Sequence, residues 1–529
     1  MSCLTARVRW RSGQRLVGDQ REPRRGESSS MNVWLIYVRD DNFFRLAPER
    51  STANGSGLSP IRVMAFPPLG IQTLAPVLRD RGYDVRLFDT CHPQMDAGHI
   101  VAAAAAERPD VLAISFLSAT TYPKTKDLAR RLKEETPDIP IIVGGPFATV
   151  NADRILQDCL EIDAVGVGEG EELLPDYLAH LQDLRAVAGL VWRCGEEVVA
   201  NPARPLIADL DRYPYADRAS LPIDYIESLP LDVPAVLSLD KFCTLQTSRG
   251  CAFSCIYCDI PALGRGKWRA RSPEHVLGEM QTLHDQGYRS IYFTDDDFLQ
   301  QPRRIQEICE GIRSRGLAFH WGCEGRVGSA AGGQLAIMTQ AGCAKLAFGI
   351  EAGSQKTLDR LGKRQTLEQV ETAVSKAKCH GIARLHGFFV VGAPGESRAD
   401  IMESFRFAAR LDLDTFSFNR LCVYRGTRLW QEYVDLGIVD DERDWHKWFK
   451  CSDVDPTALP GEIVNRARMK GYALLFTRRL LLRPLRSLRL LVAFGRHMSL
   501  ADIVRLLFSP FRRRALTREP DLPAWRSDK

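Results

Sequence analysis

The stretch RGCAFSCIYC, residues 249–258, places three cysteines in one short loop at the spacing C-x3-C-x2-C. Thiolates bind iron well, and iron–sulfur clusters are held by cysteines at such tight spacings. A cubane cluster has four irons, and this loop supplies three thiolates, from Cys251, Cys255 and Cys258. The spacing therefore predicts a 4Fe-4S cluster with one iron left open for a small molecule. An open coordination position is typical of a catalytic metal centre.

A zinc site is the alternative for this loop, with Cys243 or Asp259 as the fourth ligand. Zinc sites usually combine a CxxC pair with a second pair, and no second pair follows here. Arg249 and Gly250 precede the first cysteine and are expected to shape the loop, where an arginine also favours thiolates.

The three cysteines and Tyr257 together resemble the CxxxCxφC signature of the radical S-adenosylmethionine (SAM) enzymes, in which φ is aromatic. The resemblance implies that the open iron binds the amino and carboxylate groups of SAM, and that Tyr257 lies near its adenine. It also implies that SAM is cleaved reductively to a 5′-deoxyadenosyl radical. The cofactors carry this chemistry, while the protein orients them and excludes water.

Strand-like apolar runs alternate with helical stretches from about 239 to 440, which predicts a partial (β/α)6 barrel of the TIM type. Reactive groups in such barrels lie at the carboxyl ends of the strands. The cluster loop, the triplet Asp295-Asp296-Asp297, Glu351 and the turn at Gly392 all follow predicted strands. Their agreement in position predicts a single site, and the radical SAM core that the loop resembles has this layout.

Four residues of this site are assigned to SAM, Glu351 by its position at the end of a barrel strand and the others by the resemblance. Asp295 and Asp296 stand near the position where relatives carry acidic residues, and are expected to bond the ammonium group or ribose hydroxyls of SAM. The alternative for them is an N-cap of the following helix. Glu351 is assigned to the ribose or ammonium group, against a structural salt bridge as the alternative. Gly392 ends a strand that resembles the family's adenine-contacting strand.

A second alternation of strands and helices, from about 31 to 180, predicts an α/β domain with a doubly wound parallel sheet. Ligands of such sheets bind beyond the carboxyl ends of the strands, where glycines let the backbone approach closely. The candidate contacts at these ends are Ser115, Thr120, Gly144, Gly145, Gly168, Glu169 and Gly170. The alternative is that the glycines are only the turn residues that any α/β domain needs.

Three segments, PPLG at 67–70, GGP at 144–146 and VGEGE at 167–171, resemble the cobalamin-binding domain that precedes many radical SAM cores. The resemblance adds Leu69 and Gly70 to the expected cobalamin contacts. Many cobalamin proteins carry D-x-H-x-x-G, whose histidine binds the cobalt, but DTCH at 89–92 has the wrong spacing. His92 is therefore expected to be a loop residue rather than a cobalt ligand.

The remaining stretches are expected to connect or extend the two domains. Residues 1–30 are predicted to be a disordered extension or the result of a misassigned start, 181–238 a connector, and 441–529 a basic helical region. From 461 to 529 the chain has 16 Lys and Arg against 5 Asp and Glu. This region is expected to cap the barrel or, alternatively, to make peripheral contact with an anionic membrane. No nucleic-acid partner is expected, because no recognised motif accompanies the charge.

The chain has no apolar run of about 18 residues, so no transmembrane helix is expected. Its 14 cysteines are scattered without a secretory signal, which favours reduced thiols. We therefore expect a cytoplasmic protein, membrane-associated only through its basic C-terminal region.

These features predict a cobalamin-dependent radical SAM enzyme that methylates an unactivated carbon of a small molecule, lipid-like or tetrapyrrole in character. An electron donor such as flavodoxin or ferredoxin is the expected partner. The alternative is a radical SAM oxidative cyclase or oxidoreductase, like the anaerobic magnesium-protoporphyrin IX monomethyl ester cyclase. A more remote alternative is a non-catalytic cobalamin or redox sensor, which would have no need of an open iron.

Overall fold

The computed structural model describes residues 30–39, 44–48, 58–62, 67–90, 92, 95–221, 241–330, 332–447 and 449–482. Most of the segment 1–30, part of the expected connector and the tail from 483 onward lie outside the described residues. The chain divides into two compact units. Among the described residues, the N-terminal unit contains 30–39, 70–207 and 213–221, and the C-terminal unit contains the rest.

The N-terminal unit is built on one sheet with the strand order β4-β1-β5-β6-β7-β8-β9. Its strands are β1 Asn32–Tyr37, β4 Asp84–Asp89, β5 Val111–Ser115, β6 Ile141–Gly144, β7 Ala164–Gly166, β8 Leu190–Cys194 and β9 Glu197–Ala200. The first five strands in that order are parallel, which confirms the expected doubly wound sheet. The chain order reverses direction between β1 and β5, where ligands of such sheets bind.

An antiparallel hairpin, β8–β9, extends this sheet beyond its parallel part. It lies within 181–238, which the sequence analysis treated as a connector. Gly195 and Glu196 form its two-residue turn, and Gly195 has a φ of 65°, which suits the tight turns that connect such strands. Later residues of the same stretch also join this unit, since the N–H of Asp217 donates to the Gln72 carbonyl at 2.8 Å.

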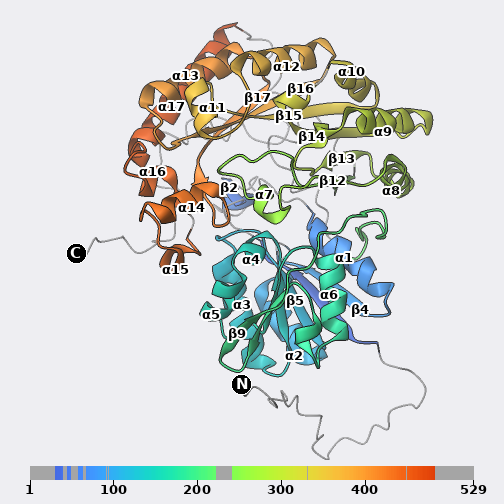
Figure 1. Ribbon diagram of the computed structural model, residues 1–529. Coiled ribbons are helices and arrows are strands. Elements are labelled where there is room, and N and C mark those ends of the chain that lie inside the picture. Colours follow the sequence, from blue (N-terminus) through green and yellow to red (C-terminus); the bar gives the residue numbers. More distant parts are fainter. Residues whose placement is uncertain are drawn as a thin grey trace, which may run out of the picture. The chain divides into compact units, whose positions relative to one another are not determined.

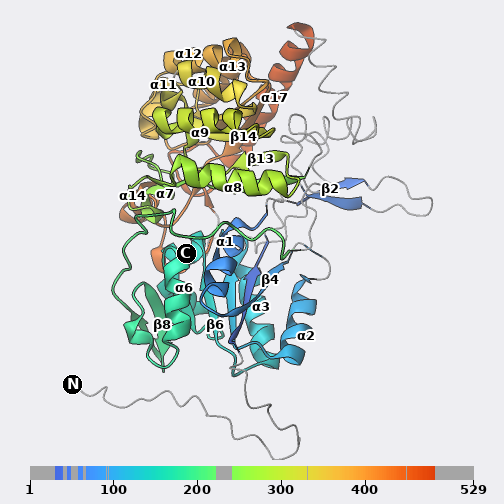
Figure 2. The ribbon, with the colours of Figure 1, turned by 90° about the vertical axis from the view of Figure 1, so that its right-hand side faces the viewer.

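Helices cover both faces of the sheet, with α1 and α6 on one face and α2, α3 and α5 on the other (Figures 1 and 2). Their bounds are α1 Leu69–Arg79, α2 Ala97–Glu107, α3 Tyr122–Glu135, α4 Pro146–Val150, α5 Ala152–Asp158 and α6 Gly170–Ala179. Strand β1 lies inside both layers, and Val33, Trp34, Leu35 and Ile36 are all buried. A continuous apolar run is what a parallel strand covered on both faces requires.

The C-terminal unit is built on six parallel strands in the order β10-β13-β14-β15-β16-β17. They are β10 Phe242–Leu245, β13 Ser290–Phe293, β14 His320–Arg326, β15 Cys343–Glu351, β16 Arg384–Val391 and β17 Thr415–Arg420. The connecting helices lie along one side of the sheet (Figure 1): α8 Pro273–Asp285, α9 Pro302–Ser314, α10 Gly332–Gln340, α11 Gln355–Arg360, α12 Leu367–Cys379 and α13 Arg398–Arg410. This arrangement confirms the partial (β/α)6 barrel.

Shorter elements complete the C-terminal unit. The strand pairs are β2 Phe44–Pro48 with β3 Leu58–Arg62, β11 Ser248–Arg249 with β12 Arg269–Ala270, and β18 Cys422–Val423 with β19 Phe449–Lys450. The helices are α7 Ile260–Leu263, α14 Arg428–Asp435, α15 Asp441–Asp444, α16 Cys451–Val454 and α17 Gly461–Leu482.

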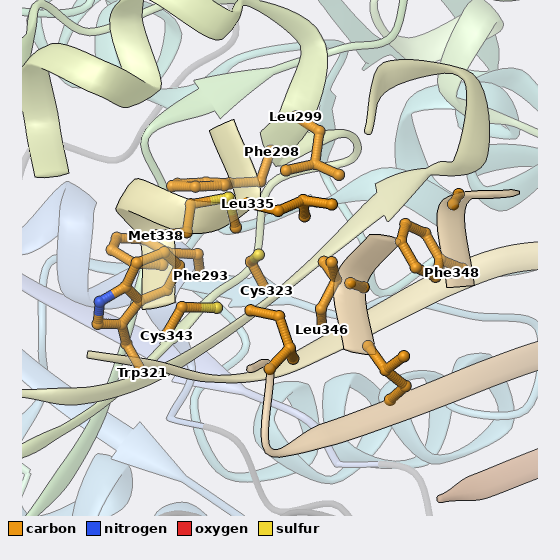
Figure 3. Close-up of a cluster of buried hydrophobic side chains, with 14 of the residues drawn as sticks. Phe293, Phe298, Leu299, Trp321, Cys323, Leu335, Met338, Cys343, Leu346 and Phe348 are labelled. Atoms are coloured by element: carbon orange, nitrogen blue, oxygen red, sulfur yellow. The ribbon is translucent and has the colours of Figure 1, made fainter. Parts of the chain in front are cut away.

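The core of the C-terminal unit lies between its sheet and the surrounding helices. Alternate residues of the strands point into it, and Figure 3 shows Phe293 of β13 and Trp321 of β14 together with Phe298, which lies in the turn after β13. The ring of Phe293 stacks on Phe298 with centroids 4.7 Å apart and meets Trp321 edge-on at 5.2 Å. The Trp321 indole N–H donates to the Ala341 carbonyl at 2.8 Å, so the ring is buried without an unsatisfied donor.

Helix α17 packs on this core and confirms that the basic region begins as a cap on the barrel. Val464, Ala467 and Leu475 are buried in the core. Gly471 lets the helix approach α13 closely, because a Cβ there would stand 2.2 Å from the Phe405 ring. In the described part of the chain no helix is long and apolar enough to cross a membrane.

The packing of the core can be tested by comparing two leucines. Leu346 in β15 is fully buried, whereas Leu436, just after α14, is 70% exposed. Leu346→Ala should lower the free energy of unfolding of the C-terminal unit by about 2–5 kcal/mol, because it leaves a cavity. Leu436→Ala, the same chemical change at the surface, should alter it by less than about 0.5 kcal/mol. Denaturant unfolding followed by circular dichroism measures both, and equal effects would contradict the packing described.

Candidate active site

The cluster loop follows β10 and is anchored at its start by Gly250. This glycine has a φ of 85°, and a Cβ on it would stand 2.1 Å from the Lys267 carbonyl oxygen, so no other residue fits without a shift of the backbone. Its N–H donates to Asp296 Oδ2 at 2.8 Å. The strand pair β11–β12 closes the loop around it. The hydrogen bond to Asp296 and the pairing of β11 with β12 therefore hold the backbone of the loop just before its first cysteine.

The three cysteines of the loop are free thiols, with Cys255 buried and Cys251 and Cys258 partly exposed. The Cys258 N–H donates to the Cys255 carbonyl at 3.2 Å, which makes a tight turn between these two ligands. Burial raises the pKa of the Cys251 thiol, and raises that of Cys258 to about 12. Iron binding must therefore displace protons, as metal binding by thiols generally does.

The donor set fits a cluster better than a single ion. In the part of the chain that the structure describes, no three His, Cys, Asp or Glu side chains gather closely enough to surround one metal ion. Each cysteine of a cubane binds a different iron, so its ligands stand farther apart than those of tetrahedral zinc. Cys243, the thiol weighed as a fourth zinc ligand, is 1% exposed and packs in the apolar core. The loop thus retains three thiols for a cluster.

Arg326, the last residue of β14, contacts the cluster loop directly. Its Nη1 donates to the Cys255 sulfur at 3.3 Å, and its guanidinium lies 3.8 Å from the centre of the Phe253 ring. Its Nη2 donates to the Lys363 carbonyl. Arg326 is buried, so this charge is held in place by its partners rather than by water.

The three consecutive aspartates hold protein groups. Asp295 is buried and accepts bonds from the Thr247 N–H at 2.7 Å and from the Thr247 and Ser248 hydroxyls at 2.5 Å. Asp296 is exposed and accepts the N–H of Gly250. These contacts favour a positioning role for Asp295, whose assignment to SAM stays a prediction. Neither Asp295 nor Asp296 caps a helix: the N-cap of α9 is Gln301.

Glu351 ends β15 in a strained conformation. Its φ is 69°, in the left-handed region, and the register of β15 with β16 shifts between Gly349 and Glu351. Its Oε1 accepts from Lys363 Nζ at 2.8 Å, and a Cβ on Gly349 would stand 2.8 Å from both atoms. Burial, and next the charge of Glu351, raise the pKa of Tyr257. Strain of this kind clusters at functional sites.

Gly392 begins the turn after β16 with a φ of 79°. Its N–H and that of Ala393 donate to Glu396 Oε2 at 2.6 and 3.1 Å. Glu396 is buried, its Oε1 has no hydrogen-bond partner, and burial raises its pKa to about 7. The Glu396 carboxyl group thus holds the backbone of the turn that is predicted to contact adenine.

In the N-terminal unit the residues assigned to cobalamin gather at the carboxyl edge of the sheet. Ser115 ends β5, Gly144 ends β6, and Gly168 follows β7. Gly145 has a φ of 105°, and a Cβ on it would stand 2.4 Å from the Phe116 carbonyl oxygen. Only glycine therefore fits at this point of the edge without a shift of the backbone. The Thr120 hydroxyl lies 2.8 Å from that of Ser118 in the loop after β5.

Glu169 and Gly170 precede and begin α6, and Leu69 and Gly70 begin α1. Glu169 Oε2 accepts the Ile207 N–H at 2.8 Å. A Cβ on Gly170 would stand 3.1 Å from Leu74, so these two helices start side by side. His92 lies in the loop after β4, where its N–H donates to the Asp89 carbonyl at 3.0 Å.

Three residues of the site were missed by the sequence analysis: Arg326, Lys363 and Glu396. Arg326 and Glu396 stand at or just after the carboxyl ends of strands, which is a signal that could have found them. Lys363 follows α11 in a loop, and nothing in its neighbourhood in the sequence indicates that it reaches Glu351.

Comparison with known proteins places both units. The B12 binding domain model matches residues 63–178, and the Radical SAM superfamily model matches residues 245–408. An uncharacterised methyltransferase of Pyrococcus horikoshii is 30% identical over 420 residues, which cover 78% of this chain and 88% of that protein. The anaerobic magnesium-protoporphyrin IX monomethyl ester cyclase of Rubrivivax gelatinosus is 26% identical over 425 residues, covering 78% and 74%.

A solved structure has a similar fold. The cobalamin-dependent SAM radical enzyme OxsB, with aqua-cobalamin and SAM bound, superposes with a TM-score of 0.66 at 17% identity. The superposition covers 92% of this chain and 75% of that one.

The thiols of the loop can be separated from those of the core by substitution. Cys255→Ala should reduce the iron of the anaerobically reconstituted protein from about four atoms per chain to below about one, because a cubane needs its ligands. Cys243→Ala, at the core position weighed for zinc, should keep the iron and the inorganic sulfide. Metal and sulfide analysis measures both, and zinc in place of iron would contradict the assignment.

The buried Glu396 should make stability depend on pH. Its pKa in the folded state is about 7, above the ordinary 4.5, so the folded protein loses stability as pH rises between these values. Glu396→Gln stays neutral and can still accept both N–H groups. Relative to the wild type, it should gain up to about 3 kcal/mol in unfolding free energy from about pH 5 to about pH 8. Glu371→Gln, on the exposed face of α12, should show no such gain.

Proposed function

The chain belongs to the radical SAM superfamily and carries a B12-binding domain, and we propose that it methylates an unactivated carbon of a small-molecule substrate. The observation that carries the proposal is the loop with three free thiols at the carboxyl edge of a barrel, in a chain with a second, B12-binding domain. The methyltransferase relative, which the chain covers over 88% of its length, supports transfer of a methyl group.

The two domains imply a 4Fe-4S cluster, SAM and cobalamin, which when bound supply the radical that removes hydrogen and the methyl group that replaces it. Cys251, Cys255 and Cys258 would hold three of the irons. Tyr257, in the cluster loop, and Glu351, at the end of β15, would contact SAM. Lys363 neutralises Glu351, which permits a carboxylate to stay buried there.

Cobalamin is assigned to the carboxyl edge of the N-terminal sheet. Gly145 keeps that edge clear, since any side chain there would strike the Phe116 carbonyl. The backbone from Gly168 to Gly170 lies beside it at the end of β7. A flat corrin needs such an approach, because the ring contacts backbone over a wide area. His92, in the loop after β4, is not assigned as a cobalt ligand.

The proposed substrate is a small molecule. The proposed electron donor is a flavodoxin- or ferredoxin-type protein. A tetrapyrrole substrate has the support of the cyclase relative. Contact with an anionic membrane rests only on the basic tail, most of which lies outside the described residues. A reducing, cytoplasmic setting is supported by the free thiols of the described cysteines.

Oxidative cyclisation is the second candidate reaction. The Rubrivivax gelatinosus cyclase is 26% identical to this chain over a similar length. Its similarity extends over the same share of this chain, 78%, as that of the methyltransferase relative, so coverage does not separate the two reactions. Only the fate of the methyl group of SAM does so.

Turnover with SAM labelled in its methyl group tests the proposal. Anaerobic protein loaded with cluster and cobalamin should release 5′-deoxyadenosine and transfer label to a product when given reductant and a cell extract. Cys255→Ala, treated alike, should give neither. 5′-Deoxyadenosine without labelled product would favour the cyclase reaction, and a protein that retains no corrinoid would refute the cobalamin assignment alone.

A further inference from the structure

We propose that Arg326 is a positioning residue for the cluster, which fixes the sulfur of Cys255 and makes the cluster easier to reduce. Neither the cysteine motif nor the domain matches assign this residue a role. The inference rests on the 4Fe-4S cluster of the proposed function, and on no other part of it.

The geometry around Arg326 leaves its guanidinium little freedom. One nitrogen donates to the Cys255 sulfur at 3.3 Å, and another to the Lys363 carbonyl. One face of the group lies on the Phe253 ring at 3.8 Å. Its backbone is fixed as well, because its N–H donates to Asp297 Oδ1 at 3.1 Å. Arginine's planar fork suits such contacts, since it directs several donors in fixed directions.

Electrostatics gives the direction of the effect. One electron passes from the flavodoxin- or ferredoxin-type donor, which is oxidised, to the cluster, which is reduced and gains one negative charge. A cation bonded to a ligand sulfur stabilises the more negative form, and hydrogen bonds to the sulfurs raise the reduction potentials of such clusters. Arg326 is 6% exposed, so water screens this charge little.

The same contacts connect the cluster to the residues assigned to SAM. Arg326 donates to the Lys363 carbonyl, and the Lys363 side chain donates to Glu351. The contacts therefore form a chain from the Cys255 thiol through Arg326 and Lys363 to the Glu351 carboxylate, which limits the relative movement of the thiol and the carboxylate.

A redox titration followed by electron paramagnetic resonance tests the inference without substrate or cobalamin turnover. In anaerobically reconstituted Arg326→Gln the ratio of reduced to oxidised cluster, at a fixed potential near the wild-type midpoint, should fall about tenfold. That change corresponds to a midpoint about 59 mV more negative for a one-electron couple. Arg326→Lys keeps the charge but loses the fork, and should fall between the wild type and Arg326→Gln.

Arg304 offers a matched control, because it is also a buried arginine of the same unit that donates to backbone carbonyls. Its nitrogens bond the carbonyls of Arg271 and Thr247 at 2.8 and 2.9 Å, and no cysteine of the loop. Arg304→Gln should therefore lower stability without moving the cluster potential. Circular dichroism of all the variants establishes that they are folded.

The outcomes separate this inference from the proposed function. A wild-type potential in Arg326→Gln with full iron content would overturn the redox role. Loss of iron from folded Arg326→Gln, with iron kept in Arg304→Gln, would support the positioning role. If Arg326→Gln does not fold, the potential of Arg326→Lys decides, and an unchanged value overturns the inference. Failure of methyl transfer would leave each of these results unaffected.

Discussion

Three consecutive carboxylates after one strand hold the catalytic end of the barrel together. Asp295 bonds Thr247 and Ser248, where the chain leaves β10 for the cluster loop. Asp296 holds the N–H of Gly250 inside that loop, and Asp297 holds the N–H of Arg326 at the end of β14. Buried carboxylates are costly unless bonded, and burial raises the pKa of Asp295 and Asp297 despite these bonds. Burying these carboxylates therefore costs some free energy of folding, while their hydrogen bonds fix the position of the loop.

Charged groups buried around the cluster form a connected set rather than isolated pairs. Arg326 donates to the Cys255 sulfur and to the Lys363 carbonyl, and the Lys363 ammonium group pairs with Glu351. Removing Lys363 or Glu351 leaves the other charge buried and unpaired, which costs more than the single bond contributes. Glu351 also carries backbone strain at a φ of 69°. Such strain persists only where the surroundings hold it, as Lys363 and the bulge of β15 do here.

The two units follow the same rule, although their sheets differ. In both, parallel strands direct their carboxyl ends to one edge, and loops at that edge carry the residues assigned to cofactors. The barrel places charged side chains at its edge, whereas the N-terminal sheet places glycines there, with Gly145 against the Phe116 carbonyl. The difference suits the ligands: SAM offers charges to bond, while a corrin offers a broad surface to approach.

Local pattern in the sequence determined the three cysteines, the strand and helix alternation, and the class of both sheets, because spacing and periodicity depend on near neighbours alone. The hairpin β8–β9 was not predicted, since the prolines that follow it, from Pro202 onward, indicated a connector. The tertiary structure alone decided that Asp295 holds Thr247 and that Lys363 reaches Glu351. Arg326 likewise meets Cys255 across 71 positions of the chain. Contacts of that kind depend on which strands lie side by side, and only the assembled sheet brings them together.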